Sequence, residues 1–289
     1  MPISRPRVLA GLLALVFVLP LATGARGASP DPGDPAYHSL RYQDDFSYLA
    51  DPTKAAGDIW DPIKYIPIGD GQYGPSYLSL GGEMRERVES YLNPNFGIKA
   101  PPSSAYLLQR LLLNIDAHVT DYIRVFAQLG EFDRVGNRGI KSTTDIDRLE
   151  LTQGFVDLLL PSPLGDAPVV RVGREELLFG YQRLIAVREG TNVRRAFDGA
   201  RITDHWGAAT IDLLMVRPVS NTLAAFDDHT NMKQLLWGGY LTVPLGPVLK
   251  VDLYELNYAN ESAKYRGLTG VEKRQTFGLR LFGQAAGFL

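Results

Sequence analysis

The sequence predicts an all-β protein, an antiparallel transmembrane β-barrel preceded by a signal peptide and an aromatic, proline-rich leader. Apolar and polar residues alternate with a period of two along about ten segments of about ten residues, the pattern of membrane-spanning strands. The connections between these segments alternate between short and long. Aromatic residues recur near the segment ends: Tyr77, Tyr91, Tyr106, Tyr122, Trp206, Trp237 and Tyr258. A soluble β-sandwich also has many alternating strands, so a secretory signal is needed to favour the barrel.

Residues 1–28 have the composition of a secretory signal peptide. Arg5 and Arg7 form a basic start, an apolar run covers Val8–Leu21, and small residues follow up to Ala28. The apolar run is short for a spanning helix, and the later sequence has no apolar run of 18 residues. We therefore expect a cleaved signal and a mature chain that reaches a bacterial outer membrane.

Residues 29–76 form the predicted leader. They are rich in Pro, Gly and Asp and carry the aromatic residues Phe46, Tyr48, Trp60 and Tyr65. Disordered linkers are seldom this aromatic. We expect an ordered segment held in place by its aromatic side chains, with a disordered linker as the alternative.

Residues 77–289 form the predicted barrel domain. In the segment 78–88, Leu78, Leu80, Met84 and Val88 lie on one face, with Arg85 and Arg87 on the other. Two further segments, 106–119 and 122–131, repeat this pattern around a turn at Thr120–Asp121. The remaining expected strands are 149–160, 169–174, 196–204, 209–216, 234–243, 248–258 and 274–282. Long polar loops are expected at 134–145, 218–231 and 260–272.

The segment from Val169 to Thr203 stands out by its arginines. It holds seven arginines and no lysine, with four acidic residues between them. Arginine offers a planar donor fork that binds carboxylates in a bidentate manner. The segment therefore indicates either a site for carboxylate-bearing ligands or a salt-bridged connection.

Several function classes lack support. The formal net charge is −2 and there is no cysteine, so neither nucleic-acid binding nor thiol chemistry is indicated. The four histidines show no metal-ligand spacing, and no common catalytic motif occurs. Glu175 and Glu176 are adjacent on a strand and point to opposite faces, so they cannot flank one glycosidic bond. We expect no enzyme activity and no cofactor.

Seven stretches together resemble the alginate export family of outer-membrane β-barrels. They are DDFSYLADP with DIWDPIKYIPIG in the leader, YLSLGGEMRERVE, LLQRLLLNIDAHV with YIRVFAQLG, and the most specific, VRVGREELLFGYQRL with TNVRRAFDGARI. The resemblance covers nearly all of residues 41–283. It implies an outer-membrane channel that passes an anionic uronate polysaccharide through an arginine-rich constriction.

The resemblance also implies a larger barrel, of about 18 strands. At about 21 residues per strand and connection such a barrel needs about 380 residues after the leader. The chain supplies 289 − 76 = 213. We therefore expect an N-terminal portion of a longer barrel, with a complete ten-stranded barrel as the alternative.

The expected pore-lining residues follow from the charged faces and from the resemblance. Those on charged strand faces are Arg85, Arg87, Arg110, Arg124, Arg171 and Arg201. Those in the segment that resembles the family's constriction are Arg174, Arg183, Arg194, Arg195 and Asp198. For each arginine the alternative role is an interior salt bridge that holds the strands in register.

The expected partners are an anionic polysaccharide or a small anionic solute, outer-membrane lipid, and proteins of a periplasmic secretion complex. Two other functions remain open at this stage. One is an uptake porin for sugars or organic anions, and the other is a soluble periplasmic carbohydrate-binding β protein.

Overall fold

The fold is described by a computed structural model that covers residues 37–55, 58–71, 74–98, 104–136, 141–161 and 167–283. The expected signal peptide, residues 1–28, and the first part of the leader lie outside the described residues. None of the helices in the described part of the chain is long and apolar enough to cross a membrane.

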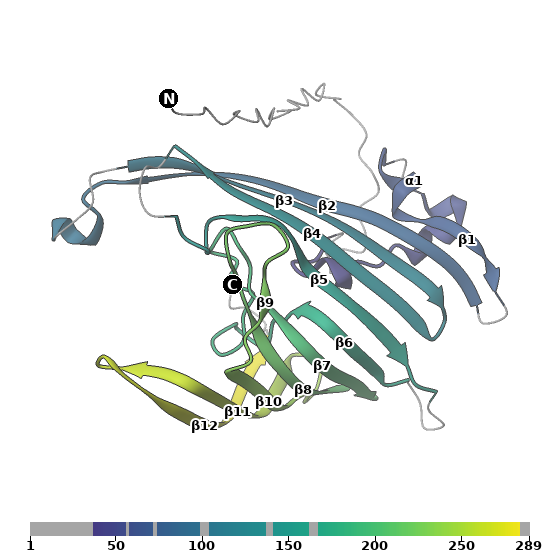
Figure 1. Ribbon diagram of the computed structural model, residues 1–289. Coiled ribbons are helices and arrows are strands. Elements are labelled where there is room, and N and C mark those ends of the chain that lie inside the picture. Colours follow the sequence, from purple (N-terminus) through teal and green to yellow (C-terminus); the bar gives the residue numbers. More distant parts are fainter. Residues whose placement is uncertain are drawn as a thin grey trace, which may run out of the picture.

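The described residues form one antiparallel sheet in which each strand pairs with its neighbours in sequence (Figure 1). Only β9 departs from this order, because it pairs with β8 and leaves β8 free to pair with β10 as well. The strands are β1 (Ile66–Gly71), β2 (Gly74–Tyr91), β3 (Ser104–Thr120), β4 (Ile123–Val135), β5 (Asp147–Leu159), β6 (Val169–Glu176), β7 (Ala196–Trp206), β8 (Ala209–Ser220), β9 (His229–Thr230), β10 (Gln234–Pro244), β11 (Leu249–Tyr265) and β12 (Leu268–Gly283).

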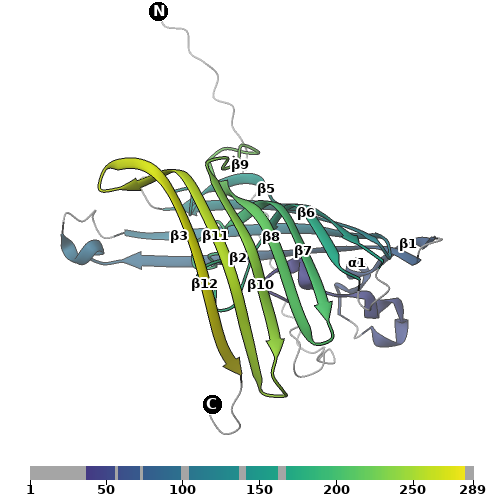
Figure 2. The same cartoon turned by 90° about the horizontal axis from the view of Figure 1, so that it is seen from below.

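The expected all-β antiparallel fold class is confirmed. The sheet is strongly curved, with β2–β5 facing β10–β12 across its interior, as Figures 1 and 2 show. Within the described residues the sheet is not closed, and β1 and β12 are its two edges. Its twelve strands exceed the expected ten by β1 and the two-residue β9. Both are too short to produce a visible period in the sequence.

The strands carry apolar residues on their convex face and charged residues inside the curve. On β3, Leu113 is 57% exposed, whereas Arg110 is buried at 1% and Asp116 at 5%. The same alternation continues on β2, where Met84 and Val88 are exposed. A large exposed apolar face around a charged interior is the arrangement of a barrel wall that faces lipid.

The connections differ between the two rims of the sheet. Three tight turns, after Thr120, Trp206 and Pro244, lie at one rim, which we call the short-turn rim. The long connections that follow Val135, Glu176 and Ser220 start from the opposite, long-connection rim. The expected long loop at 260–272 is wrong, because β11 and β12 pair there and turn at Arg266–Gly267. Both turn residues have positive φ, at 48° and 83°, which suits a tight hairpin.

The described part of the leader folds into short helices against the inner face of the sheet. These are η1 (Arg41–Gln43), η2 (Ser47–Ala50), η3 (Pro52–Lys54) and α1 (Asp61–Lys64); a further short helix, η4 (Pro94–Gly97), follows β2. Leu40 and Tyr42 are buried and pack with Phe126 and Phe155. The expected anchors Tyr48 and Trp60 are instead exposed, at 43% and 53%.

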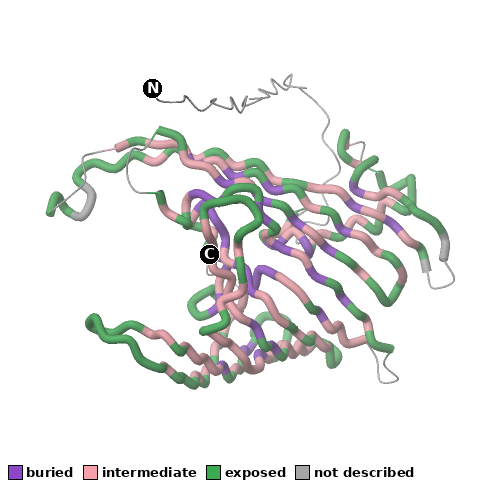
Figure 3. The backbone as a smooth tube through the Cα atoms, in the orientation of Figure 1, coloured by how far each residue is buried: buried purple, intermediate pink, exposed green. Residues whose placement is uncertain are grey.

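Residues 177–195, which connect β6 to β7, turn into the interior and are called the inner segment below. Leu177 and Ile185 pack on Leu214 and Leu256, residues of β8 and β11. Val193, near the other end of the segment, packs on Leu112 and Phe132, residues of β3 and β4. The inner segment therefore touches both sides of the curved sheet. Figure 3 shows where the backbone of the sheet and its connections is buried.

Candidate functional site

The tip of the inner segment is fastened to β2 and β3 by one carboxylate. Glu189 Oε1 accepts hydrogen bonds from Nη1 of Arg85 and Nη1 of Arg110, each at 2.7 Å. Its other oxygen accepts one from Nε of Arg194 at 2.6 Å. Three guanidinium groups thus converge on one carboxylate, with Glu83 and Glu176 as further partners of Arg110 and Arg194.

The charge state of Glu189 follows from these neighbours. Burial raises the pKa of its carboxyl, but the positive charges of Arg194 and Arg110 and their hydrogen bonds outweigh burial, so the net pKa lies below its ordinary value. Glu189 is therefore ionised at neutral pH.

Backbone groups complete the attachment of the inner segment. Arg85 Nη2 donates to the carbonyl of Thr191 and Arg110 Nε to that of Asn192, both at 2.9 Å. The fully buried Asn192 side chain donates to the carbonyls of Gln109 at 2.8 Å and Asp145 at 2.9 Å. Asn192 was not expected as a functional residue, because a single asparagine two positions after a glycine resembles an ordinary turn residue.

A second group of arginines lies nearer the short-turn rim. Arg171 binds both carboxylate oxygens of Asp157, at 2.7 Å and 2.8 Å, and its guanidinium lies over the rings of Tyr42 and Phe155 at 4.2 Å and 3.7 Å. Arg201 donates to Glu175 at 2.8 Å. Cation–π contacts and bidentate pairs of this kind hold the leader on the wall.

Three other expected pore residues are also paired. Arg124 contacts both oxygens of Asp116 and donates to the carbonyl of Tyr42 at 2.5 Å, which ties the leader to β4. Arg174 contacts both oxygens of Asp198, at 2.8 Å and 3.2 Å. The ion-pair partner of Arg87 is Glu89 at 2.9 Å.

Arg183 and Arg195 differ from all of these. Among the described residues neither has a carboxylate within ion-pair distance, and the same holds for Arg188. Burial and the neighbouring positive charge of Arg188 lower the pKa of Arg195. The inner segment therefore presents positive charge that no acidic side chain of the described residues neutralises.

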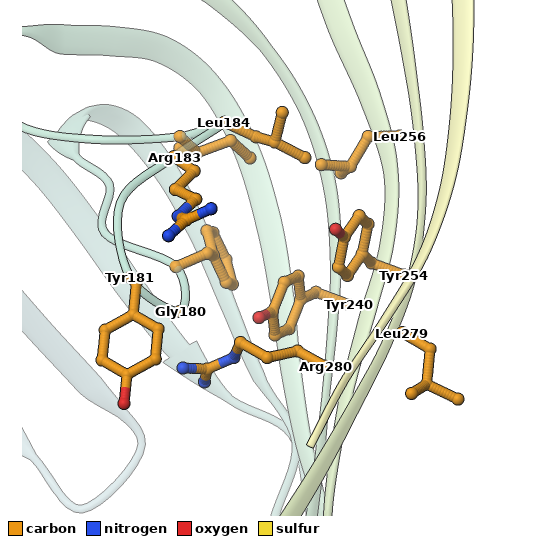
Figure 4. A pocket seen from close by; sticks show the side chains of 11 residues that line it. Gly180, Tyr181, Arg183, Leu184, Tyr240, Tyr254, Leu256, Leu279 and Arg280 are labelled. Atoms are coloured by element: carbon orange, nitrogen blue, oxygen red, sulfur yellow. The ribbon is translucent and has the colours of Figure 1, made fainter. Parts of the chain in front are cut away.

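These arginines line a series of cavities between the inner segment and strands β8 and β10–β12. Arg183 lines a cavity of about 350 Å³ together with Tyr240, Tyr254 and Arg280 (Figure 4). Arg195 lines a second cavity, of about 380 Å³, with Tyr258 and Arg274. The two cavities share Leu184, Ile185 and Leu256, so they lie next to each other.

A third cavity extends the series toward the short-turn rim. It measures about 300 Å³ and shares Phe179, Gly180, Tyr240 and Arg280 with the Arg183 cavity. Gly180 has a φ of +54°, and a Cβ there would come within 2.8 Å of the Tyr240 hydroxyl. A glycine therefore keeps the junction between the two cavities open.

The sequence of this wall matches a known family over most of the chain. A family model described as alginate export matches residues 76–288 of the 289. The chain belongs to the alginate export family. A search of curated proteins found no match, and neither did a search of solved structures.

For this alginate export chain, the eleven expected pore residues do not form one ring. Eight arginines and Asp198 are paired on β2–β7 or at the end of the inner segment: Arg85, Arg87, Arg110, Arg124, Arg171, Arg174, Arg194 and Arg201. Of the eleven, only Arg183 and Arg195 have no acidic partner among the described residues.

Sequence reasoning missed the wall opposite these two arginines. Tyr240, Tyr254 and Tyr258 lie on the interior face of β10 and β11, and Arg280 on that of β12. Asp252 accepts hydrogen bonds from the Tyr240 hydroxyl at 2.5 Å and from Arg280 Nε at 2.6 Å. The alternation of β12 does place Arg280 inside, but nothing in the sequence indicates which strands the inner segment faces.

Proposed function

We propose that this protein is an outer-membrane channel for an anionic, uronate-type polysaccharide, and that it is not an enzyme. The observation that carries the proposal is a series of three neighbouring cavities along the inner segment. Arg183 borders one and Arg195 another, opposite a row of tyrosines, and neither arginine has an acidic partner in the part of the chain that the structure describes.

The proposed path runs between the inner segment and strands β8 and β10–β12. A carboxylate-bearing sugar entering the Arg195 cavity would supply the acidic partner that Arg195 lacks among the described residues. The tyrosines opposite offer apolar ring faces and hydroxyl donors to the sugar rings. Several weak sites in series let a polymer bind and still move on, which conduction requires.

The paired arginines have a different role in this proposal. They fix the leader and the inner segment to β2–β7, and so they narrow the interior to the β8–β12 side. Their positive charge is largely balanced by carboxylates such as those of Asp157, Glu175 and Glu189. We propose that they shape the constriction and that Arg183 and Arg195 give it selectivity.

The orientation in the membrane follows from the two rims. Bacterial barrels have short turns on the periplasmic side and long loops outside. The short-turn rim would then face the periplasm, where a secretion complex delivers the polymer. The apolar convex face, with Met84, Leu113 and Val156 exposed, would contact lipid.

The test is electrical recording of the purified protein in a planar bilayer under a KCl gradient. We expect discrete channels with anion preference that uronate oligomers block and neutral oligosaccharides of equal length do not. Block by small organic anions with free passage of sugars would favour the uptake-porin alternative. Absence of channels together with recovery in the soluble periplasmic fraction would overturn the proposal and favour the carbohydrate-binding alternative.

A further inference from the structure

The barrel wall has a gap beside the first half of β5. Strand β6 is short and pairs with β5 only from Gly154 to Leu159. Residues 147–153 of β5 therefore pair with β4 on one edge and lack a strand on the other. The gap arises because the chain leaves β6 at Glu176 and turns inward.

The loop 221–228, between β8 and β9, covers this gap. The backbone N–H of Phe226 donates to the carbonyl of Leu149 at 3.2 Å. The backbone N–H groups of Asp227 and Asp228 donate to Glu150 Oε2 at 2.9 Å and 3.3 Å. Figures 1 and 2 both place β9 and the loop before it beside the start of β5. The loop thus forms a seam with β5 at the long-connection rim.

Three carboxylates meet at this seam. Asp147 and Glu150 come from β5 and Asp228 from the loop, and each offers an oxygen within 4.8 Å of the others. Asp147 is fully buried and Glu150 is 3% exposed. None of the three has an ion-pair partner among the described residues, and the nearby Arg174 is bound to Asp198. Asp228 is half-buried. Three negative charges this close together, two of them buried, repel one another unless a cation or protons neutralise them.

An unsatisfied oxygen points to a ligand at the same place. Asp147 Oδ1 is buried and has no hydrogen-bond partner, although its Oδ2 accepts from the Asn221 amide at 3.2 Å. The same amide nitrogen donates to Asp228 Oδ2 at 2.9 Å. Buried oxygens without a hydrogen-bond donor are rare in folded proteins, and a metal ion that binds the oxygen is one explanation for them.

We infer that Asp147, Glu150 and Asp228 form a calcium site that locks the 221–228 loop onto β5. All ligands are oxygens, which Ca²⁺ prefers, and rotation of the Asn221 amide would add its carbonyl oxygen as a fourth. Ca²⁺ leaves one negative charge uncompensated on the three carboxylates, beside the positive Arg174.

The setting of the site favours Ca²⁺ over Mg²⁺. The three ligand oxygens lie within 4.8 Å of one another, close enough to share one ion. Mg²⁺ demands a near-ideal octahedron and gives up its waters reluctantly. The site joins a strand to a loop through side chains that can adjust, which suits the flexible coordination of Ca²⁺. Extracellular calcium sites of this kind bind with dissociation constants of about 10⁻⁴–10⁻³ M.

The test is thermal unfolding of the purified protein in detergent, with EDTA or with CaCl₂ up to about 10 mM. We expect Ca²⁺ to raise the midpoint saturably and MgCl₂ at the same concentration to raise it less. The double variant Asp147→Asn/Asp228→Asn should lose the calcium response. In EDTA it should be at least as stable as the wild type, because the substitutions remove charge repulsion. Asp227→Asn is the matched control, since its exposed carboxylate is outside the cluster, and it should respond like the wild type.

A second readout needs no variant. Leu223 and Phe226 are exposed in the loop, so chymotrypsin can reach them. Ca²⁺ should slow cleavage in the loop at least several-fold relative to EDTA. An unchanged midpoint and unchanged cleavage with Ca²⁺ would overturn the site. A full calcium response in the double variant would place the ion elsewhere, and an equal response to Mg²⁺ would overturn the assignment to calcium.

Discussion

Arg110 and Glu189 lie 79 positions apart in the sequence, yet Nη1 of Arg110 is 2.7 Å from Oε1 of Glu189. Arg85 donates to the same oxygen at the same distance. One carboxylate on the inner segment thereby joins two neighbouring strands of the wall. Since Arg110 is fully buried there, the contact positions the inner segment on the wall.

We expect Glu189→Gln to loosen the inner segment. The substitution leaves Arg85, Arg110 and Arg194 without their shared charge, although backbone carbonyls still accept from Arg85 and Arg110. The Glu189 side chain is 42% exposed, so water screens the pairs and the loss should be about 1 kcal/mol. A loss of about 1 kcal/mol makes detachment of the inner segment from the wall about fivefold more frequent. The measurement is the rate of trypsin cleavage at the exposed Arg188 in native protein.

The control for this experiment is Glu261→Gln. Glu261 is exposed on the β11–β12 hairpin and has no ion-pair partner among the described residues. Its substitution should leave cleavage at Arg188 unchanged. Equal cleavage of the Glu189→Gln variant and the wild type would mean that the backbone contacts alone hold the segment.

Acid should loosen the same segment. The pKa of Glu189 is lowered in the folded protein, so the stability that its charge contributes is present above its ordinary pKa of 4.5. This stability is lost as the pH falls below 4.5 and through the lowered value. We expect the difference in Arg188 exposure between the wild type and Glu189→Gln to vanish in that acid range. Hydrogen exchange of the inner segment from pH 7 to pH 3 measures it, and a difference that persists at pH 3 would contradict the linkage.

The strand pattern of the wall could be predicted from the sequence because the alternation of apolar and charged side chains is a local property of each strand. The side chains of β3 alternate between the interior and the convex face, so Arg110 and Leu113 fall on opposite sides as expected. Both strands of the β11–β12 hairpin were expected, but its outer part, residues 260–272, was expected as a loop because these residues are mostly polar on both faces, which obscures the period of two. β1 was missed because its six residues include a proline and two glycines.

The candidate site was only half predictable. Its residue types follow from the sequence, since an arginine-rich segment with interspersed acids indicates a charged interior. Which arginines are paired depends on where the inner segment lies, and contacts such as Arg85 with Glu189 span 104 positions. No local pattern distinguishes the paired Arg194 from its unpaired neighbour Arg195. Only the tertiary fold determines which of the two arginines forms ion pairs.

We expect Tyr42→Ala to release the leader from the wall. The Tyr42 ring packs edge-on against Phe155 at 5.4 Å and lies under the guanidinium of Arg171, and its hydroxyl donates to the carbonyl of Glu176. Truncating a buried aromatic residue costs about 3–5 kcal/mol, more than a short leader gains elsewhere. Released, the leader no longer narrows the interior, and channel conductance should rise.

The measurement for Tyr42 is single-channel conductance in a bilayer. Tyr48→Ala is the control, because Tyr48 is on the same leader but 43% exposed, and its conductance should equal that of the wild type. Unchanged conductance of Tyr42→Ala, with the leader shown by proteolysis to be free, would mean that the leader lies outside the conducting path.

The last prediction separates the unpaired arginines from the paired ones. Arg183→Glu/Arg195→Glu should shift the reversal potential under a KCl gradient from anion toward cation preference. The physical reason is that these two charges border the cavities and lack acidic partners among the described residues, so reversing them changes the field along the path by four charges. Folding should be nearly unaffected, because no ion pair is broken. High salt should weaken the preference of the wild type, since the Debye length falls from about 10 Å at 0.1 M to about 3 Å at 1 M.

The control is Lys264→Glu/Arg266→Glu, an equal charge change at the exposed tip of the β11–β12 hairpin. It should leave the reversal potential close to that of the wild type. Arg171→Glu/Arg201→Glu should instead fail to fold, because it buries added acids beside Asp157 and Glu175. If the Arg183/Arg195 variant keeps its anion preference and its block by uronate oligomers, the conducting path does not pass between the inner segment and β8–β12. Selectivity would then have to arise from the arginines that form ion pairs with carboxylates.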